Sequence, residues 1–517
     1  MRRDRTAVKE TLHRIPHKGV VYNVLRYAGG EDTPDFHTDR IPPLSFNYLG
    51  EMDEGSPEEE TQFRAAHIDT GEAVSPQNTE GSGFSINCLT RGGVFTLTVD
   101  HDPAEFDPGQ AGEIAGGILE EMRRIVTFLS ETNASMTTAS DLGETEWSEE
   151  EFEAVTADFE SRGERVERIY PLLPMQEGML LRHLQDPEAW AYRLVDIFEM
   201  DWVPTEAQLR HVLDRMGAKH EVLRTSIVYK NVSVPRQAII DRPLGLAMAD
   251  LTAEADPEAA VKRLREEILT HGYDLQDKPL FGLTCAKVSD SRCYLVQAQH
   301  HIITDGWCTA LCMEDLTRYL QEEMTGQFTE ERPSAGGRYE AAVREILRKD
   351  MKAGLNYWRE LLSGYETRAE VPSYGTVPEN ERSEEDLLTV VLDAKKTRQL
   401  EQLCGQEGAT LSNAVELAWG MVLGVCSRTK DAVFAKVVSG RDNTETRVDD
   451  LMGLFINSVP VRVKWDDRTS ARDALRALNQ QAARSNGYDY CPLADIEQQT
   501  DLGSELLQSV LAFENYD

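Results

Sequence analysis

Residues 300–306 carry the side chains best suited to chemistry in this chain. Two adjacent histidines, His300 and His301, are followed by Asp305 and Gly306. Free histidine has a pKa of about 6.5, so it can accept or donate a proton near neutral pH. An isolated pair of histidines is equally well explained by burial in a core, but the following Asp-Gly turn favours a site. The segment therefore predicts a proton-handling site.

The preceding residues predict a strand that would hold this site in place. Residues 294–299 (YLVQAQ) alternate β-forming and polar side chains. Further along, residues 433–438 and 458–463 also have strand character. Helices are indicated after Thr205, which begins a capping box, and from Pro257. The alternation of both kinds of element predicts a mixed α/β fold rather than a bundle or a sandwich.

Length and composition limit the class of protein. A chain of 517 residues predicts two or three folding units, and a hydrophobic content of 40% excludes wholesale disorder. Without an apolar run of about 20 residues or a signal peptide, we expect a cytoplasmic protein that does not enter a membrane. The net charge of −36 disfavours nucleic acid as a partner and is attributed to solubility.

The cysteines and motifs do not predict a bound metal or cofactor. None of the eight cysteines forms a CxxC pair, and no second Cys/His pair accompanies Cys308 and Cys312. We expect buried, reduced thiols. The sequence also lacks a P-loop and a glycine-rich dinucleotide motif.

A polar, acidic stretch divides the chain. Residues 131–167 begin with small polar residues and continue into a short amphipathic helix for which Ser148 is placed as the N-cap. We interpret this stretch as an inter-domain linker. Before it, residues 84–88 and 94–100 predict a hairpin, and residues 109–130 predict a helix. So few elements indicate part of a domain.

A weak internal repeat supports that interpretation. Residues 1–50 contain a helical stretch, then Tyr22, then Phe46-Asn47-Tyr48. The end of the chain has the same order, with a helical stretch at 471–484, then Tyr488, and finally Phe513-Glu514-Asn515-Tyr516. Residues 1–50 are therefore interpreted as a diverged copy of about 471–517.

The segment at 300–306 resembles the HHxxxDG signature of condensation domains of non-ribosomal peptide synthetases. Other motifs of that family occur in its order, over about residues 168–517. They are residues 170–179 (YPLLPMQEGM), 219–226 (KHEVLRTS), 273–275 (YDL), 279–280 (PL), 439–441 (SGR) and 452–457 (MGLFIN).

Residues 1–130 resemble the C-terminal part of an epimerization domain. The markers are residues 16–22 (PHKGVVY), 25–27 (LRY) and 46–50 (FNYLG). No HHxxxDG motif lies within this part of the chain, so we expect it to be catalytically silent. An epimerization domain before a condensation domain implies a donor that ends in a D-residue, and the opening motif PMQEGM resembles the subtype that joins a D-donor to an L-acceptor.

The resemblance implies a reaction and roles for individual residues. An acceptor aminoacyl amine would attack a donor peptidyl thioester, with both substrates carried on phosphopantetheine arms. His301 would accept the amine proton or hydrogen-bond the amine, and these two roles stay open. His300 would brace the loop, and Asp305 would pair with Arg224. Gly306 would permit a backbone conformation or a close approach. Further site residues would be Trp307, as a wall of the acceptor channel, and Asn457 and Ser439, which would face the central tunnel.

The implied fold is two chloramphenicol-acetyltransferase-like lobes in a V-shaped pseudo-dimer, plus a partial lobe from the preceding domain. The N-lobe would span about 168–340, and an incomplete C-lobe about 341–517. The implied partners are the upstream and downstream peptidyl carrier domains and an adjacent adenylation domain. Residues 53–130 are expected to dock on the C-lobe within one chain or by domain-swapped self-association.

Three alternatives compete with peptide-bond formation. A catalytically silent module that recruits partners would tend to lose His301 or Gly306, and both are present. An epimerase is disfavoured by the opening motif at 170–179. Heterocyclisation is disfavoured because that subtype replaces the histidines with aspartate.

Overall fold

The computed structural model describes residues 2–28, 44–51, 84–103, 105–131, 137–186, 191–270, 272–329, 336–373 and 387–514. The chain forms two compact units, residues 1–138 and residues 139–517. Residues 53–83, which belong to the segment expected to dock on the C-lobe, lie outside the described residues, as do Asn515 and Tyr516 of the internal repeat.

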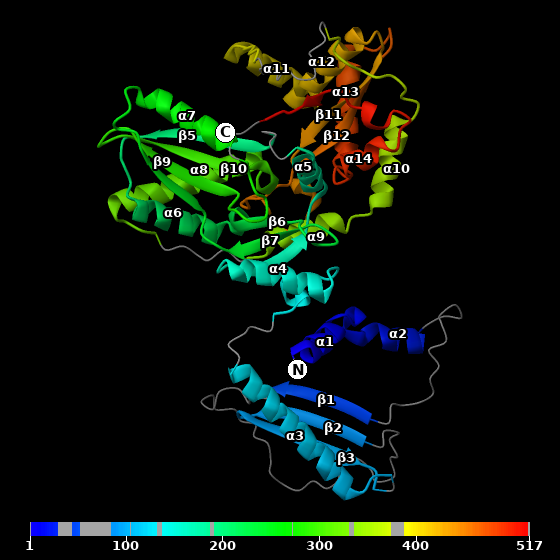
Figure 1. Ribbon diagram of the computed structural model, residues 1–517. Coiled ribbons are helices and arrows are strands. Elements are labelled where there is room, and N and C mark those ends of the chain that lie inside the picture. Colours follow the sequence, from blue (N-terminus) through cyan, green and yellow to red (C-terminus); the bar gives the residue numbers. More distant parts are fainter. Residues whose placement is uncertain are drawn as a thin grey trace, which may run out of the picture. The chain divides into compact units, whose positions relative to one another are not determined.

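The first unit contains a three-stranded sheet with a long helix against it (Figure 1). The sheet order is β1-β2-β3, with β1 and β2 parallel and β2 and β3 antiparallel, which confirms the predicted hairpin. Alternate side chains of β2 (Phe84, Ile86 and Cys88) pack with α3. The bounds are α1 (Arg2–His13), η1 (Pro16–Gly19), α2 (Val20–Ala28), β1 (Leu44–Glu51), β2 (Phe84–Arg91), β3 (Val94–His101) and α3 (Pro108–Glu131).

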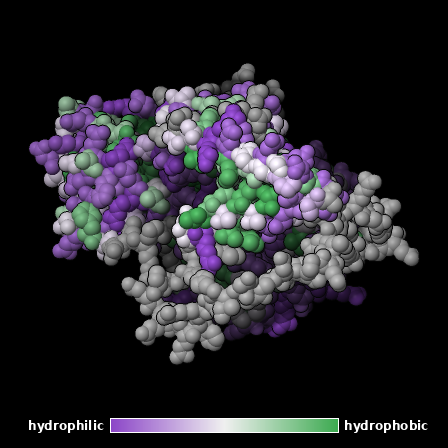
Figure 2. Space-filling view, turned by 90° about the horizontal axis from the view of Figure 1, so that it is seen from below, coloured by the Kyte–Doolittle hydropathy of each residue, from purple (hydrophilic) through white to green (hydrophobic). Residues whose placement is uncertain are grey.

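Strand β1 exposes its apolar side chains. Phe46 and Tyr48 are both exposed, as are Leu44 and Leu49. Hydrophobic residues also form a green area on the face of the molecule seen in Figure 2. The order helix, helix, strand in α1, α2 and β1 recurs at the end of the chain, in α13 (Ala471–Ser485), α14 (Leu493–Glu497) and β13 (Val510–Leu511). Both β1 and β13 join their sheets by parallel pairing. The element order thus matches the repeat seen in the sequence.

The second unit begins earlier than expected. Residues 139–161, assigned to the linker, pack into it through Trp147, Phe152 and Phe159. The buried carboxylate of Glu144 also forms an ion pair with Arg236, at 2.6 Å. The predicted linker of 131–167 is therefore wrong in its second part, because the apolar face of the short helix is covered by β4 (Arg165–Pro171) and β7 (Arg236–Asp241). Ser148 does cap that helix, as predicted.

Three sheets organise the described residues of the second unit. They have the orders β4-β7-β6, β5-β10-β9-β8 and β12-β11-β13. The strand bounds are β4 (Arg165–Pro171), β5 (Arg193–Met200), β6 (Thr225–Val228), β7 (Arg236–Asp241), β8 (Gly245–Asp250), β9 (Phe281–Lys287), β10 (Cys293–His300), β11 (Asp431–Val438), β12 (Asn457–Lys464) and β13 (Val510–Leu511).

Helices cover these sheets and connect them. The main helices are α4 (Glu149–Ser161), α5 (Pro174–Gln185), α6 (Glu206–Lys219), α7 (Pro257–Thr270), α8 (Gly306–Thr325), α9 (Arg338–Leu347), α10 (Met351–Leu362), α11 (Ala394–Gln406), α12 (Leu411–Cys426), α13 (Ala471–Ser485) and α14 (Leu493–Glu497). The short 3-10 turns are η2 (Ala139–Leu142), η3 (Glu221–Arg224), η4 (His301–Ile303), η5 (Arg441–Asn443) and η6 (Gly503–Glu505). Helix α5 contacts both η4 and β12, and Figure 1 shows it between the green and the orange strands.

Strand β10 lies inside its sheet, between β5 and β9, and both of its faces are covered. Leu295 packs in the core that contains Cys312 and Leu316 of α8, whereas Val296 packs in the cluster that contains Val261 of α7. The strand predicted at 294–299 is thus confirmed. A strand held on two edges and two faces gives the residues at its end a fixed position.

The mixed α/β fold is confirmed, whereas the division into two lobes near residue 340 stays a prediction. All eight cysteines are free, and all but Cys426 are buried, as expected for reduced thiols. Among the described residues no single helix is long and apolar enough to span a membrane; α11 and α12 meet that criterion only as a pair bent by 96°.

Candidate active site

The two histidines lie where the central strand β10 gives way to a turn and then to a helix. His300 is the last residue of β10 and pairs with Arg193 of β5. His301 begins the 3-10 turn η4, and Gly306 begins α8. The strand and the turn after it are those that the sequence predicted, and they place His301 at the edge of a rigid sheet.

His301 is held by its backbone rather than by its ring. Its N–H donates to the carbonyl oxygen of Tyr192 at 2.7 Å. Its ring nitrogen Nδ1 is buried and finds no hydrogen-bond partner among the described residues. Within the part of the chain that the structure describes, no carboxylate therefore bonds this nitrogen, in contrast to a catalytic triad. A histidine in this state can accept a proton or hydrogen-bond an amine.

His300 is fully enclosed and has the geometry of a brace. Only 2% of its surface is exposed, and its Nδ1 accepts a hydrogen bond from the N–H of Ile302 at 3.1 Å. Burial lowers the pKa of His300 to about 3, and the positive charges of His183, His301 and Arg193 act in the same direction. The ring is therefore neutral at physiological pH, with its proton on Nε2, and it does not exchange protons with a substrate.

Asp305 connects two distant parts of the second unit. Its carboxylate is completely buried and lies 3.1 Å from Nη2 of Arg441. It also accepts the backbone N–H of Phe455 at 2.9 Å and the thiol of Cys308 at 3.2 Å. Arg441 in turn donates to the carbonyl oxygens of Val448 and Leu451. The start of α8 is thus tied to the segment that joins β11 to β12.

The expected pairing of Asp305 with Arg224 is wrong. Arg224 instead forms an ion pair with Glu167 at 2.9 Å and donates to the carbonyl oxygens of Gly217 and Ile240. These contacts hold η3 against α6 and β7. The guanidinium of Arg224 is therefore occupied by partners other than Asp305. The carboxylate of Asp305 is paired with Arg441 instead.

The three residues after Asp305 have different surroundings. Gly306 does not have a positive φ, so no left-handed conformation requires glycine there. Trp307 is 42% exposed, and its indole N–H donates to the carbonyl oxygen of Asp449 at 3.2 Å. Cys308 bonds both backbone groups of Gly453, and burial raises the pKa of its thiol well above the usual range. A thiol that stays protonated is not a nucleophile.

Asn457 and Ser439 lie close together, because Asn457 pairs with Val438 across β11 and β12, but their surroundings differ. Both amide hydrogens of Asn457 are used, because Nδ2 donates to the carbonyl oxygens of Asp489 at 2.8 Å and Cys491 at 2.7 Å. Asn457 thus fixes the chain after α13. Ser439 is exposed, whereas its neighbour Gly440 is buried with φ at +66°.

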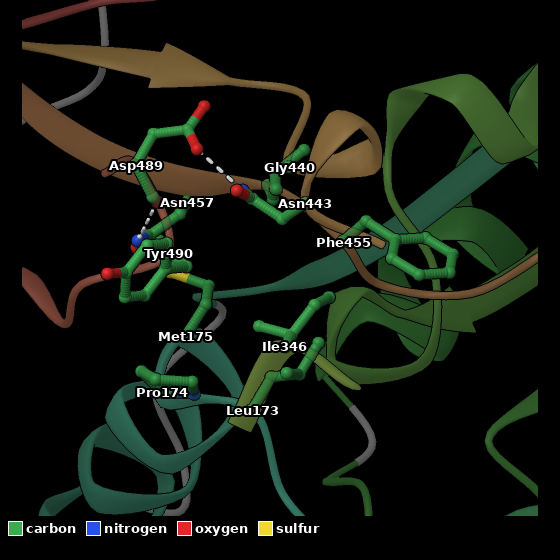
Figure 3. Close-up of a pocket in the computed structure, with 11 residues that line it drawn as sticks. Leu173, Pro174, Met175, Ile346, Gly440, Asn443, Phe455, Asn457, Asp489 and Tyr490 are labelled. Atoms are coloured by element: carbon green, nitrogen blue, oxygen red, sulfur yellow. Dashed lines mark hydrogen bonds between the residues drawn. The ribbon is translucent and has the colours of Figure 1, made fainter. Parts of the chain in front are cut away.

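Asn457 lines a narrow cavity between α5 and β12 (Figure 3). Its volume is about 20 Å³, which is room for a single water. Asp489 also lines it, accepting a hydrogen bond from Nδ2 of Asn443 at 2.5 Å. Burial raises the pKa of Asp489 to about 6. Figure 3 shows Met175 and Pro174 of α5 on the opposite wall.

Arg441, Asp489 and Gln176 were not predicted to have a role. Arg441 and Gln176 lie in recognised motifs, so a search for buried partners among motif residues could have found them. Asp489 gave no signal in the sequence. Among the described residues no group of three His, Cys, Asp or Glu side chains could hold a metal ion.

Comparison with known proteins identifies the second unit. The family model described as "Condensation domain" matches residues 166–517. The chain belongs to the condensation domain family. The condensation domain therefore includes the His301 turn, the Asp305–Arg441 bridge and the cavity between α5 and β12.

The relatives of this condensation domain are large synthetases. The chain is 29% identical to bacitracin synthase 3 of Bacillus licheniformis over 516 residues, which cover 99% of this chain and 8% of that protein. It is 27% identical to bacitracin synthase 1 of the same organism over 515 residues, which cover 98% of this chain and 10% of that protein. The chain thus spans a tenth or less of the length of these relatives, and both alignments include residues before the condensation domain.

Solved structures have the same fold. The first condensation domain of the calcium-dependent antibiotic synthetase matches 66% of this chain and 80% of its own, with a TM-score of 0.53 and 19% identity. A four-domain nonribosomal peptide synthetase bound to AMP and glycine matches 68% of this chain and 27% of its own, with a TM-score of 0.57 and 18% identity.

Proposed function

We propose that residues 139–517 form a peptide bond between two carrier-bound substrates. The donor is a peptidyl or aminoacyl thioester, and the acceptor is the amine of an aminoacyl thioester. The observation that carries the proposal is the unpartnered, buried Nδ1 of His301 at the end of a rigid strand. Because Nδ1 is buried, a substrate would reach the ring at Nε2, which is not among the buried unpartnered atoms of the described residues.

The chemistry needs little more than positioning and one proton transfer. The amine nitrogen attacks the thioester carbonyl, a C–N bond forms and the C–S bond breaks. The proton lost by the amine ends on the thiol of the donor arm. Because a thioester is already activated, no covalent intermediate on the protein is needed. The buried, protonated thiol of Cys308 agrees with this.

Three groups share the work in this proposal. His301 accepts the amine proton or hydrogen-bonds the amine. His300 is neutral and holds the turn through Ile302. Asp305 does not touch substrate but keeps the turn and the β11–β12 connection together through Arg441. Trp307 borders the acceptor channel from an exposed position.

The first unit supports a finer proposal about the donor. Residues 1–130 are assigned to the end of an epimerization domain, without an active site of its own in this chain. Alignments that cover this region together with the condensation domain support its origin as a neighbouring synthetase domain. The donor then ends in a D-residue and the acceptor is an L-residue.

The proposed partners follow from the reaction. Two peptidyl carrier domains deliver the phosphopantetheine arms, and an adenylation domain loads the acceptor carrier. The exposed apolar side chains of Val94, Ile114 and Val126 support docking of residues 53–130 on the C-lobe, within the chain or between two copies.

A condensation assay with carrier-loaded donors tests the function. Product formation is measured with D- and L-donors, for the wild type and for His301→Ala. We expect faster condensation of the D-donor and a large loss of turnover in His301→Ala. Equal rates for the two donors would refute only the proposed preference for a D-donor, not peptide-bond formation. Carrier binding without product in the wild type would support the silent module, and exchange of the donor α-proton would support an epimerase.

A further inference from the structure

The position of the His301 ring depends on the main chain around it. Nδ1 has no hydrogen-bond partner among the described residues, so no side chain there orients the imidazole through this atom. On the N-terminal side, the backbone N–H of His301 is held by the carbonyl oxygen of Tyr192. On the C-terminal side, the carbonyl oxygen of the following residue, Ile302, accepts a hydrogen bond from a side chain 126 residues earlier.

That side chain is Gln176 on α5, which is completely buried. Its Nε2 lies 2.9 Å from the carbonyl oxygen of Ile302. Its Oε1 accepts the backbone N–H of Leu173 at 2.8 Å. Because a backbone N–H can only donate, the oxygen of the amide must face Leu173, and the NH₂ group must face Ile302.

A second buried amide completes the arrangement. Gln237 on β7 exchanges two hydrogen bonds with Gln176, at 3.0 and 3.1 Å. Its Nε2 also donates to the carbonyl oxygen of Pro171 at 2.7 Å. Both hydrogens and both acceptor sites of the Gln176 amide are therefore used. A buried polar network whose members are all satisfied is rigid, and it specifies one geometry.

We propose that Gln176 is a positioning residue for the reaction at His301, acting through the carbonyl of Ile302. The Gln176–Gln237 pair connects η4 to α5, β4 and β7 and thereby determines the position of the His301 imidazole. This inference rests on the proposed function, because it assigns Gln176 to the same chemistry.

The expected consequence is a loss of turnover rather than of substrate affinity. Gln176 is buried and does not touch a bound substrate, so KM should stay close to the wild-type value. A displacement of about 1 Å at a reacting group can cost about a hundredfold in rate. We therefore expect Gln176→Met to lower kcat by about ten- to a hundredfold.

Gln276→Met is the matched control for general destabilisation. Gln276 is also a buried amide of the second unit, and its Oε1 accepts the backbone N–H groups of Tyr229 and Lys230. These hydrogen bonds involve neither η4 nor α5. We expect Gln276→Met to lower the thermal midpoint to a similar extent as Gln176→Met while kcat stays unchanged. A kcat of Gln176→Met equal to that of this control would overturn the proposal.

Gln176→Glu keeps the test valid if the methionine variant does not fold. A neutral glutamic acid can donate its O–H to the carbonyl of Ile302, whereas an ionised one cannot and would repel it. The ratio of kcat in Gln176→Glu to kcat in the wild type should therefore fall as the pH rises over about pH 5 to 9. A constant ratio would contradict the positioning role.

His301→Ala separates failure of this inference from failure of the function. If His301→Ala loses turnover but Gln176→Met does not, only the positioning role is refuted. If His301→Ala turns over like the wild type, the proposed function itself fails, whatever the result for Gln176.

Discussion

Removing the guanidinium of Arg441 should destabilise the condensation domain far more than removing an exposed arginine nearby. In Arg441→Met the carboxylate of Asp305 stays buried but loses its cationic partner. The carbonyl oxygens of Val448 and Leu451 also lose their donors. Methionine fills much of the volume, so the change is mainly electrostatic.

The magnitude follows from these contacts. Breaking a buried ion pair by removing one partner costs about 3–5 kcal/mol, and a buried carbonyl left without a donor adds about 1 kcal/mol or more. Two hydrogen bonds, from Phe455 and Cys308, still support the carboxylate and reduce the loss. We therefore expect a decrease of about 4 kcal/mol in the free energy of unfolding, about a thousandfold in the equilibrium constant.

Arg338→Met is the control. Arg338 pairs with Asp450 at 2.7 Å, close in sequence to the Arg441 contacts, but the two side chains are 31% and 54% exposed. An exposed pair contributes about 0.2–1 kcal/mol. Urea unfolding followed by tryptophan fluorescence should show a much larger shift for Arg441→Met. Amide hydrogen exchange at Phe455, whose N–H donates to Asp305, should also become faster.

Equal unfolding midpoints for the two arginine variants would refute this reasoning. So would a large shift in both, because it would mean that exposure does not distinguish the pairs. A lower unfolding midpoint in Arg441→Met without faster exchange at Phe455 would mean that the loss of stability does not arise from the contacts of Asp305.

Three other measurements test the site. The decreases in the free energy of unfolding caused by Arg224→Met and Asp305→Ala should add within about 0.5 kcal/mol in the double variant, because the two residues share no partner. A clear departure from additivity would support the pairing expected from sequence. Gly440→Ala should lower the free energy of unfolding by about 3 kcal/mol or more, because its new Cβ would lie 1.9 Å from the carbonyl oxygen of Phe455. Gly326→Ala, at a position with a similar φ of +69° and open space, should lower it by about 1 kcal/mol. Similar thermal midpoints for the two variants would contradict this. The third concerns Asp489, whose pKa is raised from 3.8 to about 6 in the folded chain. The folded state binds this proton more tightly than the unfolded state, so the contribution of Asp489 to stability falls as the pH rises from about 4 to 6. Between about pH 4 and 7, the free energy of unfolding of Asp489→Asn should rise by up to about 3 kcal/mol relative to that of the wild type. A difference in urea midpoint between the two proteins that does not change with pH would contradict this.

Elements with local signals are predicted well. Ser148 caps its helix as predicted, and Thr205 caps its helix with the capping box that the sequence indicates. The strand before the histidines and the hairpin across Gly92 and Gly93 are also confirmed. Each of these depends on residues a few positions apart, so the pattern is visible along the chain.

Features that depend on distant partners are not predicted. The sequence assigns the helix after Ser148 to a linker, because nothing in that helix shows that β4 and β7 cover its apolar face. The motifs favour Arg224 as the partner of Asp305, although Arg441 lies 136 residues from Asp305 and contacts it. Two arginines in two motifs cannot be distinguished without their positions in space.

The sequence by itself determined that this chain contains a condensation domain and which residue types stand at its centre. Motif order and spacing are properties of the chain, so they can be recognised before it folds. Only the tertiary structure decided how those residues are held: a buried neutral His300, an Asp305–Arg441 bridge, and a Gln176 amide that reaches the turn of His301. Burial and contacts between distant segments set protonation and orientation, and both arise only when the chain is folded.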